Sequence, residues 1–248
     1  TDRLKDISLS VRAGEIVGLG GLDGQGQRDL LLALFGVLRG CSGNVLIDGA
    51  PVKINSPTTA KSEKIGMALI PEDRKTEGLM LPMTVRDNLS FASLHRISDN
   101  GIVNRAKEQK YIDEMISLLA IKTAGTDIPV GSLSGGNQQK VVIAKWLFRE
   151  SRVIFFDEPT RGIDVGAKFA IYELMDRLAA QGIGIVLISS ELPEILGLTD
   201  RVAVFHNGRI TRVLDTRATS QQEIMHHASV RHADAAPITA PTLIPVAP

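Results

Sequence analysis

The sequence has only one cysteine, Cys41, among its 248 residues. A framework of intrachain disulfides is therefore excluded, and the composition favours a reducing compartment. The sequence also lacks an excess of either charge, since 28 Lys and Arg residues balance 28 Asp and Glu residues. Because nucleic-acid-binding domains usually carry a basic excess or a basic stripe, we expect no nucleic-acid partner.

Long hydrophobic runs are missing as well. The longer apolar runs, such as residues 153–156 and 185–188, have the length of strands and fall far short of the ~20 residues that a membrane-spanning helix needs. The start of the sequence shows no signal-peptide pattern, and its first residue is Thr1 rather than Met. We therefore expect a fragment of a longer polypeptide. With 44% hydrophobic residues, the chain is long enough for one large domain or two tightly joined lobes.

Hydrophobic patterning predicts strands that alternate with helices. We expect strands at residues 4–11, 16–19, 65–70, 153–156 and 183–189, and hairpins that join 44–47 to 52–54 and 202–205 to 210–213. We expect helices at residues 29–35, 133–147, 165–180 and 192–196, and helical spacing also recurs across 84–121. This alternation predicts an α/β fold with a mostly parallel sheet.

The domain organisation follows from the same pattern. We expect one domain over residues 1–228, in which a helical subdomain at about 84–145 is inserted into the α/β core. The remainder, residues 229–248, is rich in Ala and Pro and is expected to be a disordered tail.

A glycine-rich loop joins the predicted strand 16–19 to the helix that follows it. Such a loop curls so that its backbone N–H groups face an anion at the helix N-terminus. A phosphate-binding loop reads G-x-x-x-x-G-K-[ST], but here Gln27 stands in place of the Lys and Arg28 in place of the hydroxyl residue. The residues placed to contact a phosphate are Gly21, Gly24, Gly26, Gln27, Arg28 and Asp29. Taken alone, the loop is equally compatible with a turn that binds nothing.

Two carboxylates follow the apolar run 153–156. The carboxyl ends of parallel strands are where ligands bind in an open α/β sheet. Asp157 is suited to hold Mg²⁺ through water, and Glu158 is suited to polarise a water that attacks a phosphate. An ordinary acidic turn is the alternative, but it does not explain the preceding apolar run and the Pro159-Thr160 sequel.

A second anion site is predicted at the start of the helix 133–147. Ser134 is a favourable N-cap, and Gly135 and Gly136 leave backbone N–H groups accessible. Helix capping alone would need only the serine. The paired glycines and the amide side chain of Asn137 therefore favour contacts with a nucleotide.

These motifs resemble those of ATP-binding cassette (ABC) proteins. LSGGNQQK at residues 133–140 is similar to the signature motif of that family, and VIFFDEPTRGID at 153–164 is similar to its Walker B motif and D-loop. The resemblance spans about residues 4–225. It is closer still to the second cassette of the tandem ATPase subunit of bacterial simple-sugar importers, of the ribose, xylose and galactose type. PEDRKTEG at 71–78, the NQQK ending and SSELPE at 189–194 are the marks of that group.

The resemblance implies a P-loop NTPase-like cassette with a mostly parallel sheet, an antiparallel β part and a helical subdomain. In this family two cassettes enclose two ATP molecules, each between the Walker motifs of one domain and the signature of the other. The resemblance implies ATP and Mg²⁺ as cofactors, metal contacts from Asp157 and Glu72, and catalytic roles for Glu158, Asp164 and Ser190, which stands at the switch-His position. It also implies a degenerate site, because the Walker A Lys and Ser/Thr, the Q-loop Gln and the switch His are replaced. The signature at Ser134, Gly135 and Gly136 would then complete the partner cassette's site.

The same resemblance implies the partners and the location. The partners would be the first cassette of the same polypeptide or a homodimer mate, transmembrane permease subunits and, indirectly, a periplasmic sugar-binding protein. The chain would be a peripheral subunit at the cytoplasmic face of the inner membrane. Segment 72–78 and the helical insert would face the permease, although a charged solvated loop is the alternative. Two other functions stay open: a pseudo-cassette that holds nucleotide without hydrolysis, and an importer ATPase for another solute such as a nucleoside or an autoinducer. A soluble ABC protein of DNA repair or translation is disfavoured by the neutral charge.

Overall fold

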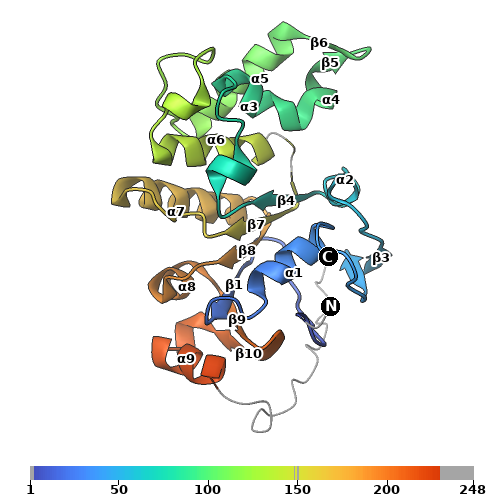
Figure 1. The fold of residues 1–248 in the computed structure, drawn as a ribbon, viewed down its shortest axis with the longest axis vertical. Helices are drawn as coiled ribbons and strands as arrows, with labels where there is room; N and C mark the ends of the chain where they lie inside the picture. The colour runs from blue at the N-terminus through green and yellow to red at the C-terminus, as the bar shows by residue number, and fades with distance from the viewer. Residues whose placement is uncertain (1–2, 148, 150, 230–248) are drawn as a thin grey trace.

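The fold is built on a six-stranded sheet. The computed structural model describes residues 3–147, 149 and 151–229. The strand order is β10-β9-β1-β8-β7-β4, and every neighbouring pair is parallel except β10 with β9 (Figure 1). The strands are β1 (Ile16–Gly21), β4 (Met67–Ile70), β7 (Val153–Asp157), β8 (Gly184–Ile188), β9 (Arg201–His206) and β10 (Arg209–Asp215). The predicted α/β class with a mostly parallel sheet is confirmed.

The central strands are continuous apolar runs because a parallel sheet is covered on both of its faces. Ile154, Phe156 and Leu187 have no exposed surface. The strands pair in register, with Phe155 opposite Val186. This core holds the ends of β1, β7 and β8 at one edge of the sheet, where the candidate site lies.

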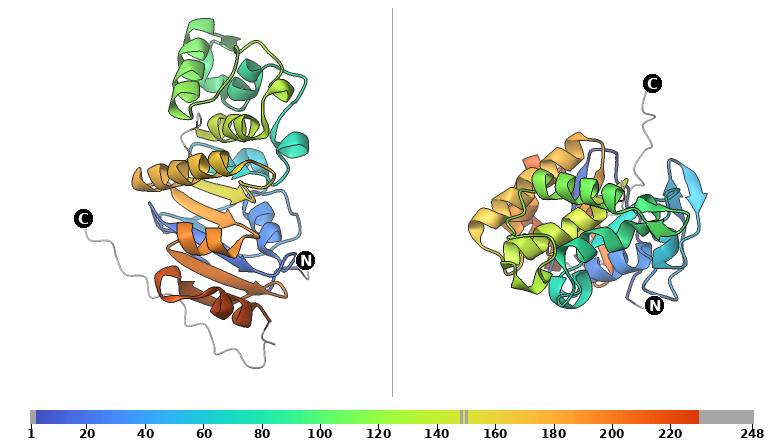
Figure 2. Two further views of the ribbon diagram at one scale, coloured as in Figure 1. Left: turned by 90° about the vertical axis from the view of Figure 1, so that its left-hand side faces the viewer. Right: turned by 90° about the horizontal axis from the view of Figure 1, so that it is seen from above.

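Helices gather at one end of the molecule, beyond β4 and β7, and the views of Figure 2 agree with Figure 1 on this arrangement. They are α3 (Val85–Ser90), α4 (Leu94–Ile97), α5 (Arg105–Leu118) and α6 (Gly135–Leu147). The helical character predicted for 84–121 is confirmed, with a short hairpin inside it whose two strands, β5 (Ser98–Asp99) and β6 (Ile102–Val103), have two residues each. Thr84 and Asp87 form a capping box that begins α3, and the side chain of Asn104 caps α5.

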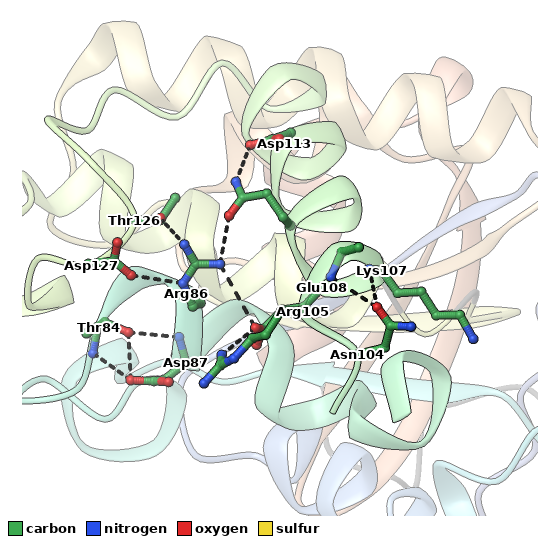
Figure 3. Close-up of polar contacts among 12 residues, drawn as sticks. Thr84, Arg86, Asp87, Asn104, Arg105, Lys107, Glu108, Asp113, Thr126 and Asp127 are labelled. Atoms are coloured by element: carbon green, nitrogen blue, oxygen red, sulfur yellow. Dashed lines mark hydrogen bonds and ion pairs between the residues drawn. The ribbon is translucent and has the colours of Figure 1, made fainter. Parts of the chain in front are cut away.

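A polar cluster around Arg86 joins the parts of this helical end (Figure 3). Its guanidinium donates to Asp127 Oδ1 at 2.9 Å, to Gln109 Oε1 at 2.8 Å and to Thr126 Oγ1 at 2.8 Å. Glu108, which is 3% exposed, places its Oε2 4.0 Å from Nη1 of Arg86. The cluster joins α3 and α5 to the segment that leads into α6. It therefore helps to hold α6 in its position.

The remaining elements mostly match the sequence prediction. They are α1 (Gln27–Leu34), β2 (Val45–Ile47), β3 (Ala50–Val52), α2 (Pro57–Ala60), a π-helical turn η1 (Arg74–Gly78), α7 (Val165–Ala180), α8 (Leu192–Leu198) and α9 (Gln221–Ser229). Both predicted hairpins are confirmed, as β2 with β3 and as β9 with β10. Among the described residues, no helix has the length and apolar character to cross a membrane. The predicted disordered tail lies outside the described residues except for Ser229, which ends α9.

The predicted strand at 4–11 is wrong. The segment forms no strand among the described residues, although Leu4, Ile7, Leu9 and Val11 do pack against the core. Asp6 adopts a φ of 49°, which turns the backbone in the middle of the expected strand. The alternating pattern therefore reports which side chains pack inward here, without pairing of the segment into a sheet.

Candidate functional site

The glycine-rich loop lies between the end of β1 and the start of α1. Gly21, Gly24 and Gly26 have φ values of 132°, 72° and 115°, which favour glycine over any other residue. A Cβ on Gly21 would also lie 2.6 Å from the carbonyl oxygen of Phe205. The loop therefore has the curled backbone that the sequence predicts.

The side chains of the loop form bonds within the protein. Gln27, which is 7% exposed, donates from Nε2 to the carbonyl oxygen of Leu22 at 3.0 Å. Gln25 accepts from the backbone N–H of Asn207 at 2.8 Å. Asp29 pairs with Arg3 at 3.3 Å. Gln27, at the Walker A Lys position, thus closes the loop on itself and carries no charge toward a phosphate.

Arg28 lies at the centre of a group of three carboxylates. Its Nε is 3.1 Å from Asp157 Oδ2, at ion-pair distance but without the alignment of a hydrogen bond. Nη1 is 3.4 Å from Glu72 Oε2, and Nη2 donates to both oxygens of Glu77 at 2.9 and 3.1 Å. We call Arg28, Glu72, Glu77 and Asp157 the Arg28 cluster. It brings together Arg28 and both predicted metal ligands, and it adds Glu77, which the sequence did not identify.

The Arg28 cluster does not fit a Mg²⁺ ion. Magnesium binds carboxylate oxygens that are free to face it, whereas Asp157 and Glu72 already face a guanidinium. Burial raises the pKa of Asp157 to about 6, against the opposing charge of Arg28 and with help from Glu77 and Asp23.

Glu158 and Ser190 meet at the ends of β7 and β8. The hydroxyl of Ser190 donates to Glu158 Oε2 at 3.1 Å, and the backbone N–H of Glu158 donates to the carbonyl oxygen of Ile188 at 3.0 Å. Burial raises the pKa of Glu158, while the hydrogen bonds from Ser190 oppose that shift. Glu158 has a φ of 49°, a conformation rarely adopted outside glycine and a feature of functional turns. The two predicted catalytic residues are therefore side by side.

The segment that follows β4 is joined to the D-loop. Glu72 Oε1 pairs with Arg161, and Arg74 donates to the carbonyl oxygens of Arg161 at 3.0 Å and Gly162 at 3.3 Å. Asp164, a further predicted catalytic residue, caps α7 by accepting from the backbone N–H of Ala167 at 2.9 Å. In this structure Asp164 has a local structural role.

The signature residues lie at the start of α6. The hydroxyl oxygen of Ser134 accepts from Asn137 Nδ2 at 2.9 Å, and Asn137 Oδ1 accepts from the backbone N–H of Lys122 at 2.9 Å. Ser134 is exposed. Arg74 lies between this region and the D-loop. Its guanidinium donates to the D-loop carbonyl oxygens of Arg161 and Gly162, and its Nη2 is so close to Gly135 that a Cβ there would lie only 2.8 Å away.

A buried carboxylate behind the site was not predicted from the sequence. Glu194 is 6% exposed and accepts hydrogen bonds from Thr160 at 2.8 Å, from Ser189 at 2.7 Å and from Tyr172, with Lys168 at 3.3 Å. It joins the turns after β7 and β8 to α7 and α8. Its place in the SSELPE motif was visible in the sequence, but apart from Ser189 its partners come from two other segments, the turn after β7 and α7.

Comparisons with known proteins agree with these motifs. A family model described as ABC transporter matches residues 4–161. The chain is 62% identical over 238 residues to the ribose import ATP-binding protein RbsA 1 of Mesorhizobium japonicum, a match that covers 96% of this chain and 46% of that protein. It is 47% identical over 225 residues to the ribose import ATP-binding protein RbsA of Geobacillus kaustophilus, covering 91% of this chain and 45% of that protein. The chain thus spans less than half the length of these relatives.

Solved structures show the same fold at low sequence identity. The cbiO1 protein from Clostridium perfringens, described as part of the ABC transporter complex cbiONQ, superposes with a TM-score of 0.73 at 24% identity. That match covers 90% of this chain and 86% of the other. MJ1267 in its ADP conformation, an ATP-binding cassette of an ABC transporter, gives a TM-score of 0.71 at 22% identity, covering 90% of this chain and 87% of the other. These likenesses establish the cassette fold.

Proposed function

Because the chain belongs to the ABC transporter family, we propose that it is a nucleotide-binding domain of a carbohydrate importer, which couples ATP binding and hydrolysis to sugar uptake. The names of its relatives support a sugar, since two of them, at 62% and 47% identity, are ribose import ATP-binding proteins. The cofactors would be ATP and Mg²⁺, and the permease subunits and, indirectly, a periplasmic sugar-binding protein would be its partners. It would work as a peripheral protein at the cytoplasmic face of the inner membrane.

Within that importer, we place the chain as the second cassette of a tandem ATPase, with a degenerate site of its own. The observation that carries this proposal is the pairing of Arg28 with Asp157 and Glu72, together with Gln27 bonded inside its own loop. A phosphate at this loop would meet no lysine, because Gln27 holds that position, and the loss of an ammonium weakens stabilisation of the transition state. We expect weak or absent hydrolysis here, although the carboxylate of Glu158 is retained and accepts a hydrogen bond from Ser190.

Unlike the glycine-rich loop, the signature has groups that can reach a nucleotide. Ser134 is exposed, and it lies at the N-terminus of α6. We propose that Ser134, Gly135, Gly136 and Asn137 complete the ATP site of a partner cassette. That partner would be the first cassette of the same polypeptide or, in its absence, a homodimer mate.

The test is ATP turnover of the full tandem protein. Ser134→Arg puts a long cation where the partner's ATP would lie, so we expect ATPase activity and transport to fall by at least about tenfold. Ser132→Arg is the matched control, because Ser132 is also exposed but its hydroxyl donates to the carbonyl oxygen of Pro129 at 2.7 Å, away from the helix start. Unchanged activity in Ser134→Arg would contradict the role in the partner's site.

A second measurement addresses the domain's own site. The 248-residue chain alone is titrated with ATP by calorimetry, with and without Mg²⁺, and its phosphate release is followed. We expect no sustained turnover. Tight Mg²⁺-dependent binding with sustained turnover would contradict the degenerate site, whereas binding without turnover, combined with an inert Ser134→Arg, would favour the pseudo-cassette.

A further inference from the structure

The Arg28 cluster has the arrangement of a metal site with an amino-acid cation at its centre. Resting on the proposed degenerate site, we propose that the Arg28 guanidinium permanently replaces the divalent cation of this cassette, so that the domain's own site holds no metal ion and needs none to keep its shape.

The geometry gives each guanidinium nitrogen its own carboxylate. Nε faces Asp157 at 3.1 Å, Nη1 faces Glu72 at 3.4 Å, and Nη2 faces Glu77 at 2.9 Å. Asp157 ends β7, whereas Glu72 and Glu77 belong to the segment 72–78 that follows β4, so two separate parts of the chain converge on one cation from α1. Carboxylate oxygens brought together in this way are the ligand set that a hard divalent ion prefers.

The charges show why a metal ion would not enter. Three carboxylates face Arg28, and the second oxygen of Glu72 is already paired with Arg161. Two guanidinium groups therefore offset most of the negative charge in the cluster. A divalent ion would have to displace a cation that is tethered by its own backbone, and a tethered group has a high effective concentration at its site.

The same contacts fix the segment 72–78. Glu72 and Glu77 lie at its two ends, and Asp73 begins η1 by accepting from the backbone N–H of Lys75 at 2.8 Å and from Thr76 Oγ1 at 2.7 Å. Arg28 therefore braces this segment against α1 at both ends. The brace is part of the chain, so the position of the segment does not depend on a bound ion.

The proposal predicts that a metal site appears when the guanidinium is removed. Arg28→Ser supplies the small hydroxyl residue of an ordinary phosphate-binding loop and leaves three carboxylates without their cation. Titration of the 248-residue chain with Mn²⁺, followed by electron paramagnetic resonance, should show one bound ion in Arg28→Ser with at least tenfold higher affinity than in the wild type. Arg28→Ser/Asp157→Asn should lose that ion again.

Arg3→Ser is the matched control. Arg3 is also an arginine beside the loop, but among the described residues its side chain pairs with a single carboxylate, that of Asp29. It removes the same charge, so a rise in Mn²⁺ affinity equal to that of Arg28→Ser would show a general charge effect and overturn the proposal. An Arg28→Ser variant that is folded and binds no Mn²⁺ would overturn it too.

Hydrogen exchange of peptides that cover 72–78 provides a second readout. In the wild type, protection should be equal in EDTA and in millimolar Mg²⁺. In Arg28→Ser it should fall in EDTA and return when Mg²⁺ is added.

The wild-type measurement keeps the test valid even if Arg28→Ser does not fold. A stoichiometric Mn²⁺ site in the wild type that Asp157→Asn removes would overturn the proposal. These readouts involve no ATP turnover, so their failure is separate from the outcome of Ser134→Arg.

Discussion

A Cβ atom on Gly136 would lie 2.6 Å from the Cβ of Ala167, so the backbone of α6 packs directly on the methyl group of Ala167 in α7. Real Cβ atoms do not approach this closely, and both atoms belong to helices that cannot move apart without disturbing the core. The second glycine of the signature therefore has a packing reason in addition to its proposed place at a nucleotide.

Gly136→Ala is expected to destabilise the fold by about 1–3 kcal/mol, because overpacking pushes α6 away from α7. Urea unfolding measures the loss. Ala167→Gly removes the facing atom, so the double variant should be more stable than the sum of the two single changes by about 1 kcal/mol or more.

The matched control for Gly136→Ala is Gly197→Ala in α8, where an added Cβ would meet nothing within 4 Å. It should stabilise the protein by about 0.5–1 kcal/mol, as expected for alanine in a helix. Purely additive effects at Gly136 and Ala167 would show that the close approach is relieved elsewhere.

The parts of the site that could be predicted are those that depend on residues adjacent in the sequence. The glycine-rich loop and the strand that ends in Asp157 and Glu158 each depend on a few consecutive residues, and the structure contains both. The role of Arg28 was not predictable, because its partner Glu77 is 49 positions away and charge complementarity at that distance leaves no pattern.

The failure at residues 4–11 has a related cause. Period-two alternation indicates which side chains face the core, and it does so correctly there, since the apolar residues are partly buried against it. The pattern does not reveal the left-handed conformation of Asp6, whose carboxylate pairs with Arg209, 203 positions away, at 2.8 Å.

Glu194 is expected to be a principal polar support of the site. Glu194→Ala would leave the hydroxyls of Thr160 and Ser189 and the ammonium of Lys168 without their shared acceptor, so we expect a loss of about 3 kcal/mol or more in the free energy of unfolding. Glu191→Ala is the control, because Glu191 also pairs with Lys168 but its side chain is 54% exposed. It should cost less than about 1 kcal/mol.

The difference in the free energy of unfolding between the wild type and Glu194→Gln should depend on pH. Burial by itself raises the pKa of Glu194, but hydrogen bonds from Tyr172, Ser189 and Thr160 and the charge of Lys168 outweigh it and leave the pKa lowered from 4.5. A carboxyl with a lowered pKa in the folded state stabilises it above the unfolded pKa, and this stability is lost as the pH falls through the folded value. The advantage of the wild type over Glu194→Gln should therefore be constant at neutral pH and shrink below pH 4.5. An advantage that does not change down to pH 3 would contradict a charged Glu194.

Lys145 allows a test in the alkaline range. It lies on α6, donates to the carbonyl oxygen of Gly78, and holds its Nζ 5.7 Å from the centre of the Trp146 ring. Burial, with a smaller contribution from the charge of Lys61, lowers the pKa of Lys145 from 10.5 to about 8. The charged form is therefore disfavoured in the folded protein, and α6 carries this cost at neutral pH.

The sign of the pH effect follows from proton binding. Between about pH 8 and 10.5 the unfolded chain binds more protons at Lys145 than the folded chain does, so the free energy of unfolding rises with pH in this range. Lys145→Met removes that dependence. Relative to Lys145→Met, the wild type should gain about 1–2 kcal/mol between pH 7 and pH 10, a range that allows for the partial exposure of the ammonium. Urea unfolding at both pH values measures the gain.

The control is the same change at Lys110, Lys110→Met. The side chain of Lys110 is 78% exposed, so this change should alter the free energy of unfolding by less than about 0.5 kcal/mol at either pH. If the difference between wild type and Lys145→Met stays flat from pH 7 to 10, then Lys145 keeps its full charge in the fold and its bond to Gly78 compensates for burial.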